Sequence, residues 1–157
     1  MLIDLQNYLT FENIYLWTNF GVLPFWLMLI FIPNYKITQI LTNSVLLPLI
    51  LACTYIYTFY QFILLDQSVF EILQLYLSLD SLYTVFASEA FLLVFWLHFI
   101  ALNLFLGTWV SRDGLKYNLP RGFLILSLII IYFTGPVGLV LYWFIRIFYA
   151  KKLGFND

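Results

Sequence analysis

The sequence contains few charged residues, one cysteine and one histidine. Charged residues make up 10% of its 157 positions, whereas a soluble domain has roughly a quarter. The net charge of −1 argues against a nucleic-acid-binding protein, which needs a basic face. A single cysteine, Cys53, excludes an internal disulfide, and one histidine with scattered carboxylates shows no metal-ligand spacing. There is also no glycine-rich phosphate loop, so we expect neither a metal nor another cofactor.

Hydrophobic residues make up 64% of the chain, and its mean hydropathy is +0.95. Apolar runs of about twenty residues recur, each long enough to cross a ~30 Å hydrocarbon core as a helix. Because no water satisfies backbone amides at that depth, helices are expected. The composition predicts an all-α, polytopic membrane helix bundle, with residues 1–157 forming one transmembrane domain.

About four transmembrane helices are expected, at residues 12–32, 43–65, 88–111 and 122–149. The first dozen residues contain no Lys or Arg, unlike a cleaved signal peptide, so we expect the first span to remain in the mature protein. Residues 67–86 have an amphipathic period and are expected to lie at the interface or against the bundle. Within them, Asp80 is predicted to be the N-cap of the next helix.

The last span, 122–149, contains the sequence Thr-Gly-Pro-Val-Gly, which predicts a helix kinked or broken near Pro136. If this span crosses the membrane once, three of the seven basic residues lie on one side of the membrane and four on the other. The excess of basic residues that marks the cytoplasmic side is then too small to give the orientation. As a re-entrant hairpin, the span would place six of the seven on one side. We take the single crossing as the simpler model. Asp113-Gly114, in the preceding charged segment, predicts a turn.

Span 88–111 contains three polar residues that an anchoring helix does not need: Glu89, His98 and Asn103. An ionisable group within a membrane helix is by default a candidate functional residue. His98 could equally be a neutral side chain that bonds another helix, and Asn103 could do the same. Glu89 could simply stabilise the positive end of the helix dipole. A His98 ring facing lipid, or sealed in packing without a cavity, would count against a functional role.

Several segments, in order, carry a resemblance to a known family: NFGVLPFWLMLIFIP, LLPLIL, FASEAFLLVFWLHFIALNLFLGTWVSRDG and GPVGLVLY. Over about residues 19–142 the chain resembles the abscisic-acid-deficient-four family. Its plant members are plastid membrane proteins required to make neoxanthin from violaxanthin, and its bacterial relatives are of unclear function.

The resemblance extends to individual positions. The matching residues are Ser88 and Glu89, Trp96 and His98, Asp113 and Gly114, Arg121, and Pro136 to Gly138. One departure is Asn103, which stands where the family usually has an aspartate before Leu-Phe; this puts the plant-type reaction in doubt. The chain lacks the long plant amino-terminal extension, which favours a bacterial inner membrane or an organellar membrane over plastid import.

The resemblance implies a cofactor-independent isomerase that opens a carotenoid epoxide to an allene by acid–base chemistry. We assign the two catalytic roles to His98 and Glu89. Trp96, Asn103, Asp113, Arg121 and Pro136 are predicted to contact the substrate.

The expected partners are membrane lipid and an apolar carotenoid-like ligand, with a homo-oligomer or membrane-complex partner also open. The alternative function is a non-catalytic subunit or carotenoid-binding partner of a larger membrane complex. A transporter is a weaker alternative, because the sequence has no internal repeat.

Overall fold

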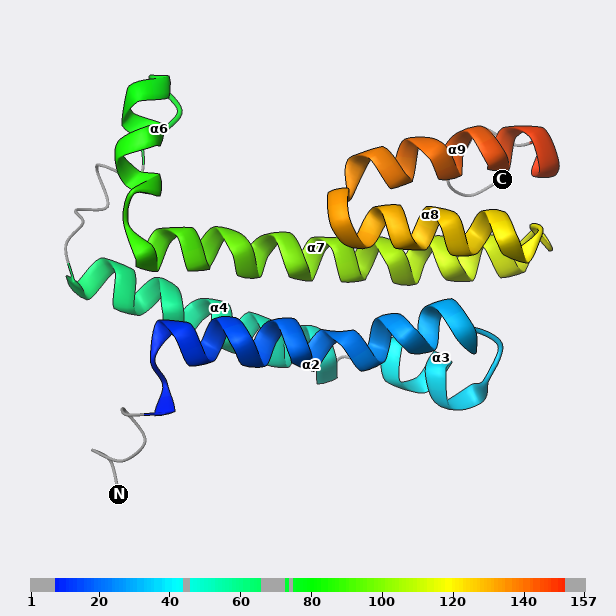
Figure 1. The fold of residues 1–157 in the computed structure, drawn as a ribbon, viewed down its shortest axis with the longest axis horizontal. Helices are drawn as coiled ribbons and strands as arrows, with labels where there is room; N and C mark the ends of the chain where they lie inside the picture. The colour runs from blue at the N-terminus through cyan, green and yellow to red at the C-terminus, as the bar shows by residue number, and fades with distance from the viewer. Residues whose placement is uncertain (1–7, 44–45, 66–72, 74, 152–157) are drawn as a thin grey trace. The chain divides into compact units, whose positions relative to one another are not determined.

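A computed structural model describes residues 8–43, 46–65, 73 and 75–151 (Figure 1). In these residues the regular elements are all helices, which confirms the predicted fold class for the described part of the chain. The helices are α2 (Phe11–Phe31), α3 (Lys36–Asn43), α4 (Leu46–Leu65), α6 (Leu79–Phe86), α7 (Glu89–Lys116), α8 (Arg121–Thr134) and α9 (Pro136–Ala150).

The chain divides into two compact units. Unit 1 comprises Met1–Gly21 and Pro48–Phe99, and unit 2 comprises Val22–Leu47 and Ile100–Asp157. Helices α2 and α7 each contribute residues to both units.

Two of the described helices, α2 and α7, are long and apolar enough to cross a membrane. The prediction of four spans is therefore not confirmed. Helix α2 follows the predicted span 12–32 closely, whereas the predicted span 43–65 is shortened to α4, with α3 as a separate helix before it. Of the amphipathic segment predicted at 67–86, residues 67–72 and 74 lie outside the described residues, and α6 forms its last part.

Helix α7 continues five residues beyond the predicted end of its span and closes with Lys116, whose charge favours the negative end of the helix dipole. The turn predicted at Asp113-Gly114 is wrong, because both residues lie within this helix. The isolated dipeptide favours a turn, but its aspartate is held by side chains of another helix, as described below.

Aromatic and aliphatic side chains form the core of unit 1. One cluster joins α2 to α7 through Ile14, Leu93 and Leu97, and a second joins α4, α6 and α7 through Phe62, Val85 and Ala90.

The start of α6 differs from the prediction. Ser78, not Asp80, is the N-cap: its hydroxyl accepts a hydrogen bond from the backbone N–H of Ser81 at 3.1 Å. Asp80 occupies the first turn instead, where its carboxylate favours the positive end of the dipole.

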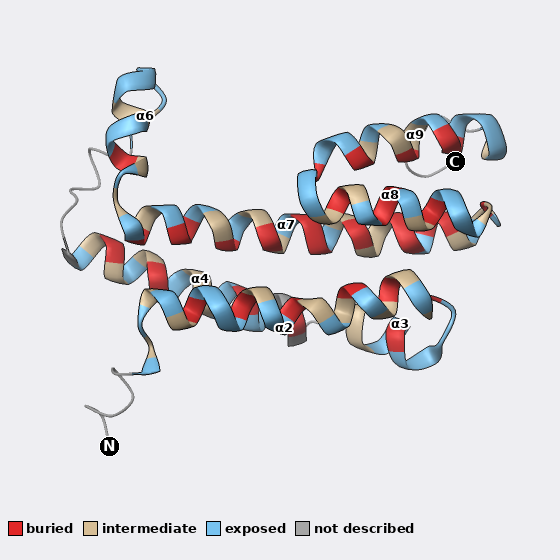
Figure 2. Ribbon diagram, viewed as in Figure 1, coloured by how far each residue is buried: buried red, intermediate tan, exposed pale blue. Residues whose placement is uncertain are grey.

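Helices α8 and α9 of unit 2 lie side by side and run in opposite directions (Figure 1). The predicted break is confirmed at Gly135, whose φ of 60° and ψ of −89° end one helix and begin the next, with Pro136 at the first helical position. Gly138 permits the close pairing, since a Cβ there would come within 2.4 Å of the Ile131 backbone nitrogen. Each helix buries one stripe and exposes the rest (Figure 2). The predicted span 122–149 is thus a helical hairpin.

Candidate functional site

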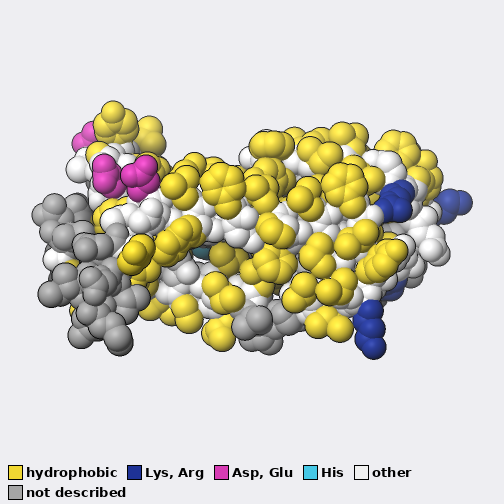
Figure 3. All heavy atoms as spheres, turned by 60° about the horizontal axis from the view of Figure 1, so that its bottom comes forward, with side chains coloured by type: hydrophobic (Ala, Val, Ile, Leu, Met, Phe, Trp, Pro, Cys, Tyr) yellow, Lys and Arg dark blue, Asp and Glu magenta, His cyan; other side chains and the backbone are white. Residues whose placement is uncertain are grey.

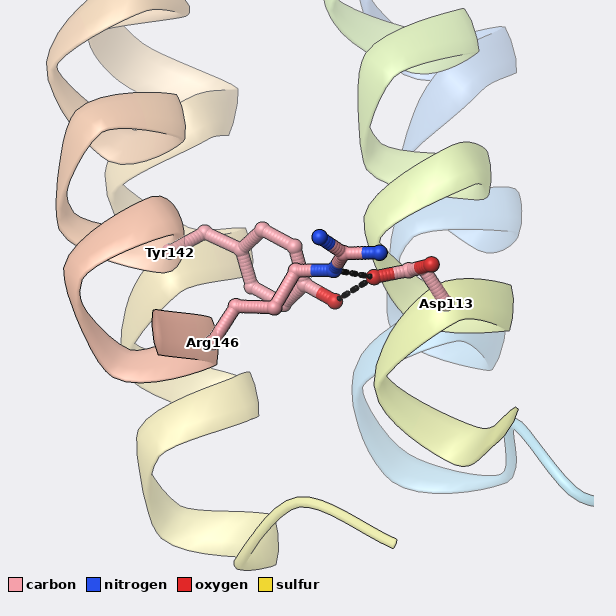
Figure 4. Close-up of polar contacts among 3 residues, drawn as sticks. All are labelled: Asp113, Tyr142 and Arg146. Atoms are coloured by element: carbon pink, nitrogen blue, oxygen red, sulfur yellow. Dashed lines mark hydrogen bonds and ion pairs between the residues drawn. The ribbon is translucent and has the colours of Figure 1, made fainter. Parts of the chain in front are cut away.

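A buried polar cluster in unit 2 joins the end of α7 to α9 (Figure 4). The Oδ2 atom of Asp113 accepts a hydrogen bond of 2.5 Å from the Tyr142 hydroxyl and one of 2.7 Å from Arg146 Nε. Tyr142 and Arg146 are four residues apart on α9, so they share one face of that helix. Both are fully buried, and Asp113 is only 7% exposed.

Aromatic rings surround the guanidinium group of this cluster. The ring centroids of Tyr117 and Trp143 each lie 4.9 Å from the guanidinium carbon of Arg146. Trp109 packs edge-on against the Tyr142 ring, with centroids 5.8 Å apart. A buried ion pair must offset the loss of hydration with good geometry and further contacts. The three aromatic rings supply such contacts, so the cluster can hold α9 against the end of α7.

A pocket of about 250 Å³ adjoins the same end of α7. It is lined by Pro33, Asn34, Gly114, Leu115, Asn118, Leu119, Arg121 and Leu124. Arg121 is exposed, and its Nη2 donates a hydrogen bond to the backbone carbonyl of Phe31. The pocket is smaller than the roughly 300–1,000 Å³ that encloses a drug-sized ligand. It is therefore too small to enclose a ligand of that size.

Three of the residues predicted for the site lie in unit 1, on the first half of α7. Glu89 and His98 are both exposed, and the His98 ring lies 6.3 Å from the Tyr55 ring, centroid to centroid. Trp96 is half-buried and donates a hydrogen bond of 3.2 Å from Nε1 to Asn19 Oδ1, which links α7 to α2. Exposure of the His98 ring is among the outcomes that count against a functional role, so its place in a site stays a prediction.

The helix separates the two proposed catalytic groups. Glu89 and His98 are nine residues apart, which corresponds to roughly 13 Å along the axis and to opposite faces of a helix with 3.6 residues per turn. One copy of the chain therefore does not hold both groups against the same few atoms of a substrate. That Glu89 and His98 act together in catalysis stays a prediction. It requires a second copy of the chain, or a ligand that reaches both faces of α7.

The other predicted site residues lie in unit 2. Asp113 lies in the buried polar cluster, and Arg121 lines the pocket. Pro136 is exposed at the start of α9. Asn103 is 6% exposed, and a Cβ at Gly135 would come within 2.4 Å of its Oδ1 atom. Its Nδ2 atom has no hydrogen-bond partner in the part of the chain that the structure describes.

Sequence reasoning missed Tyr142 and Arg146. Arg146 was considered only as one of the seven basic residues counted for the membrane orientation. An arginine inside an apolar run, however, needs a buried partner. The spacing of tyrosine and arginine by four residues was the available signal, but it does not identify Asp113, which is 33 residues away. The described residues include no group of three or more His, Cys, Asp or Glu side chains that could hold a metal ion.

The family model described as ABA DEFICIENT 4-like matches residues 13–142. The chain belongs to the ABA DEFICIENT 4-like family. This confirms the resemblance found in the sequence. The match includes Asp113 and ends at Tyr142, so Arg146 lies beyond it. A search of curated proteins and a search of solved structures each returned no match.

The polar residues of this ABA DEFICIENT 4-like protein are of two kinds. Glu89 and His98 of unit 1 are exposed at the surface of α7. Asp113, Tyr142 and Arg146 of unit 2 are buried together, in the same unit as a small pocket.

Proposed function

We propose that the protein binds a carotenoid-like polyene in the membrane and isomerises its epoxide end group to an allenic alcohol. Membership of the ABA DEFICIENT 4-like family carries this proposal. Two helices able to cross a membrane and the many exposed large hydrophobic side chains support a long apolar ligand lying against the helices.

The reaction is a net isomerisation. A general acid protonates the epoxide oxygen, and the bond from that oxygen to the carbon beside the polyene breaks. A base removes a proton from the neighbouring polyene carbon, and the electron pair forms the second double bond of the allene. One proton enters and one leaves, so the tertiary alcohol forms without a redox cofactor.

His98 is the residue that we propose for one proton transfer, with Glu89 for the other. The exposed position of His98 beside Tyr55 lets a polyene at the helix surface reach the imidazole and cover it. Because Glu89 points to the opposite face of α7, a homo-oligomer would be needed to bring both groups to one end group. Trp96, which lies on the same unit, is proposed to contact this ligand, and the contact predicted for Asn103 stays a prediction.

For unit 2 taken by itself, we propose that the pocket lined by Arg121 receives a hydroxyl group of a carotenoid-like ligand. Arg121 lies at the pocket and exposes donors to it, and Pro136 begins the helix that Asp113 holds through Tyr142 and Arg146. In this proposal Asp113 is a positioning residue, because its Oδ2 atom already accepts two hydrogen bonds within the protein.

Expression in cells that accumulate a 5,6-epoxy carotenoid tests the proposal. We expect a new allenic product with the natural chain, at least tenfold less with His98→Ala or Glu89→Gln, and full product with Cys53→Ser, an exposed position on α4. Mixing the His98→Ala and Glu89→Gln chains should restore product if two copies share a site. No allenic product from the natural chain would overturn the proposed reaction.

The rival function is a non-catalytic subunit or carotenoid-binding partner in a membrane complex. The separation of Glu89 from His98, and the use of Asp113 within the buried cluster, favour it because few acid–base groups remain. Native purification distinguishes the two. A stoichiometric partner protein or bound polyene absorbance without conversion supports the rival, whereas turnover by the isolated protein excludes it.

A further inference from the structure

The hairpin α8–α9 is too short for either arm to cross a bilayer. The two helices contain 14 and 15 residues. At 1.5 Å per residue each is roughly 21–23 Å long, against a hydrocarbon core of about 30 Å.

Contacts with α7 show how far the hairpin extends. Its tip, Gly135, meets Asn103, while its second arm reaches Asp113 through Tyr142 and Arg146. Asn103 and Asp113 are ten residues apart on α7, which corresponds to roughly 15 Å. The hairpin therefore follows α7 for at least this distance, and its arms of roughly 21–23 Å end before they cover a hydrocarbon core of about 30 Å.

The helix break at the tip satisfies the condition for irregular backbone at membrane depth. Such backbone is tolerated where protein covers it, and not where it faces lipid. Gly135 is buried, and its backbone N–H donates to the Ile131 carbonyl at 2.9 Å. The buried side chain of Asn103 lies directly against it.

The end of unit 2 from which the hairpin starts contains the basic residues. Helix α7 finishes there with Lys116, and Arg121 at the start of α8 is bonded to the end of α2. Figure 3 shows Lys and Arg side chains gathered at this end, beyond the hydrophobic sides of the unit. We call this set the basic end; its exposed members are Lys36, Arg112, Lys116, Arg121 and Lys151. With the buried Arg146, these are the six Lys and Arg residues in the described part of the chain, and all belong to unit 2.

We propose that α8–α9 is a re-entrant hairpin and that the basic end binds anionic lipid headgroups of the cytoplasmic leaflet. Lys and Arg near the ends of membrane helices gather on the cytoplasmic side, where the leaflet is negatively charged. A hairpin that leaves and re-enters the same leaflet brings the start of α8 and the end of α9 to that side together. The proposal rests on the membrane placement assumed above, but it does not depend on the carotenoid reaction.

Single cysteines test the topology in a Cys53→Ser background, which removes the only natural cysteine. Gly122→Cys and Tyr149→Cys mark the two ends of the hairpin, and Val137→Cys marks its tip; all three positions are exposed, and a Cβ at Gly122 has open space. In intact bacterial cells we expect an impermeant maleimide to label none of them. In inverted vesicles it should label the two ends but not the tip, and in detergent all three.

Labelling of the two ends from opposite sides would show that the last stretch crosses the membrane, which overturns the hairpin. Labelling of both ends from outside the cell would overturn the cytoplasmic assignment. Absence of carotenoid conversion would leave the labelling pattern unchanged, so failure of the two proposals is distinguishable.

Lipid binding is tested by thermal unfolding in nanodiscs. The natural chain should unfold several degrees higher in phosphatidylglycerol than in phosphatidylcholine. The variant K36Q/K116Q/K151Q should lose at least half of that difference, whereas Gln39→Ala, an uncharged change on α3, should retain it. Equal unfolding temperatures of the natural chain in the two lipids would overturn the lipid-binding surface.

Discussion

The two units of this chain treat polar side chains in opposite ways. In unit 1 the acid and the imidazole of α7, Glu89 and His98, are exposed, and the core is formed by aliphatic and aromatic clusters. In unit 2 an aspartate, a tyrosine and an arginine are buried together and bonded to one another. A residue type that is rare in an apolar sequence, such as histidine here, is therefore not necessarily the one whose polar group is buried and paired in the folded chain.

The largest loss of stability is expected for Arg146→Met. It leaves the Asp113 carboxylate buried without its ion partner, a change that costs about 3–5 kcal/mol. Chemical unfolding in detergent micelles measures it, with the exposed Arg112→Met as the control, for which we expect less than about 0.5 kcal/mol. If both variants unfold alike, the buried cluster does not stabilise unit 2.

Tyr142→Phe removes one hydrogen bond to the same carboxylate and keeps the ring. A hydrogen bond to a charged group contributes about 1.5–3 kcal/mol, and we expect a loss of that size in the free energy of unfolding. The exposed Tyr149→Phe is the matched control and should be neutral. Equal stability of the two variants would mean that Tyr142 only fills space.

Gly135→Ala places a Cβ at a backbone conformation that side chains rarely adopt and against Asn103. We expect a loss of about 1–3 kcal/mol. Gly122→Ala is the control, because its Cβ would meet open space within α8, and there helix propensity predicts a gain of up to about 1 kcal/mol. A stable Gly135→Ala variant would contradict the helix break.

In unit 1, Trp96→Phe removes the hydrogen bond to Asn19. We expect a smaller loss, about 0.5–1.5 kcal/mol, since both groups are neutral. The exposed Trp17→Phe is the control for the loss of an indole ring. A loss as large as that of Arg146→Met would show that unit 1 also depends on its polar contacts.

His98→Ala should change the free energy of unfolding least, by less than about 0.5 kcal/mol, because the ring is exposed. Under the proposed function the same variant loses its product in the carotenoid conversion assay. A large loss of stability, measured by the same unfolding experiment, would instead assign His98 to packing.

Much of the fold could be predicted from the sequence, because it depends on local properties. Apolar runs predicted helices, and Gly135-Pro136 predicted the break in the last one. The side-by-side pairing of the two resulting helices could not be chosen over a single crossing, because both satisfy the same hydropathy. The turn predicted at Asp113-Gly114 was wrong for a related reason. The preference of this dipeptide for a turn is a smaller energy than that of the buried ion pair between Asp113 and Arg146 of α9.

The candidate site was predictable only in part. Asp113 and Arg121 were named from the sequence; Asp113 lies in the buried cluster of unit 2 and Arg121 lines a pocket of the same unit, while their contact with a substrate stays a prediction. Tyr142 and Arg146 were missed, since each looks like an ordinary interfacial residue until its partner is known. Asn103 was noted as a departure from the family pattern, but its contact with Gly135 could not be foreseen.

Composition, periodicity and residue order are enough to show that this chain is helical, apolar and related to the ABA DEFICIENT 4-like proteins. Which polar residues are buried together, and where the last two helices turn back, becomes visible only in the folded chain. Those outcomes depend on contacts between residues tens of positions apart, such as Asp113 with Arg146. A local sequence pattern does not predict such a contact, because the free-energy cost of burying a charge is offset only when the folded chain places its partner beside it.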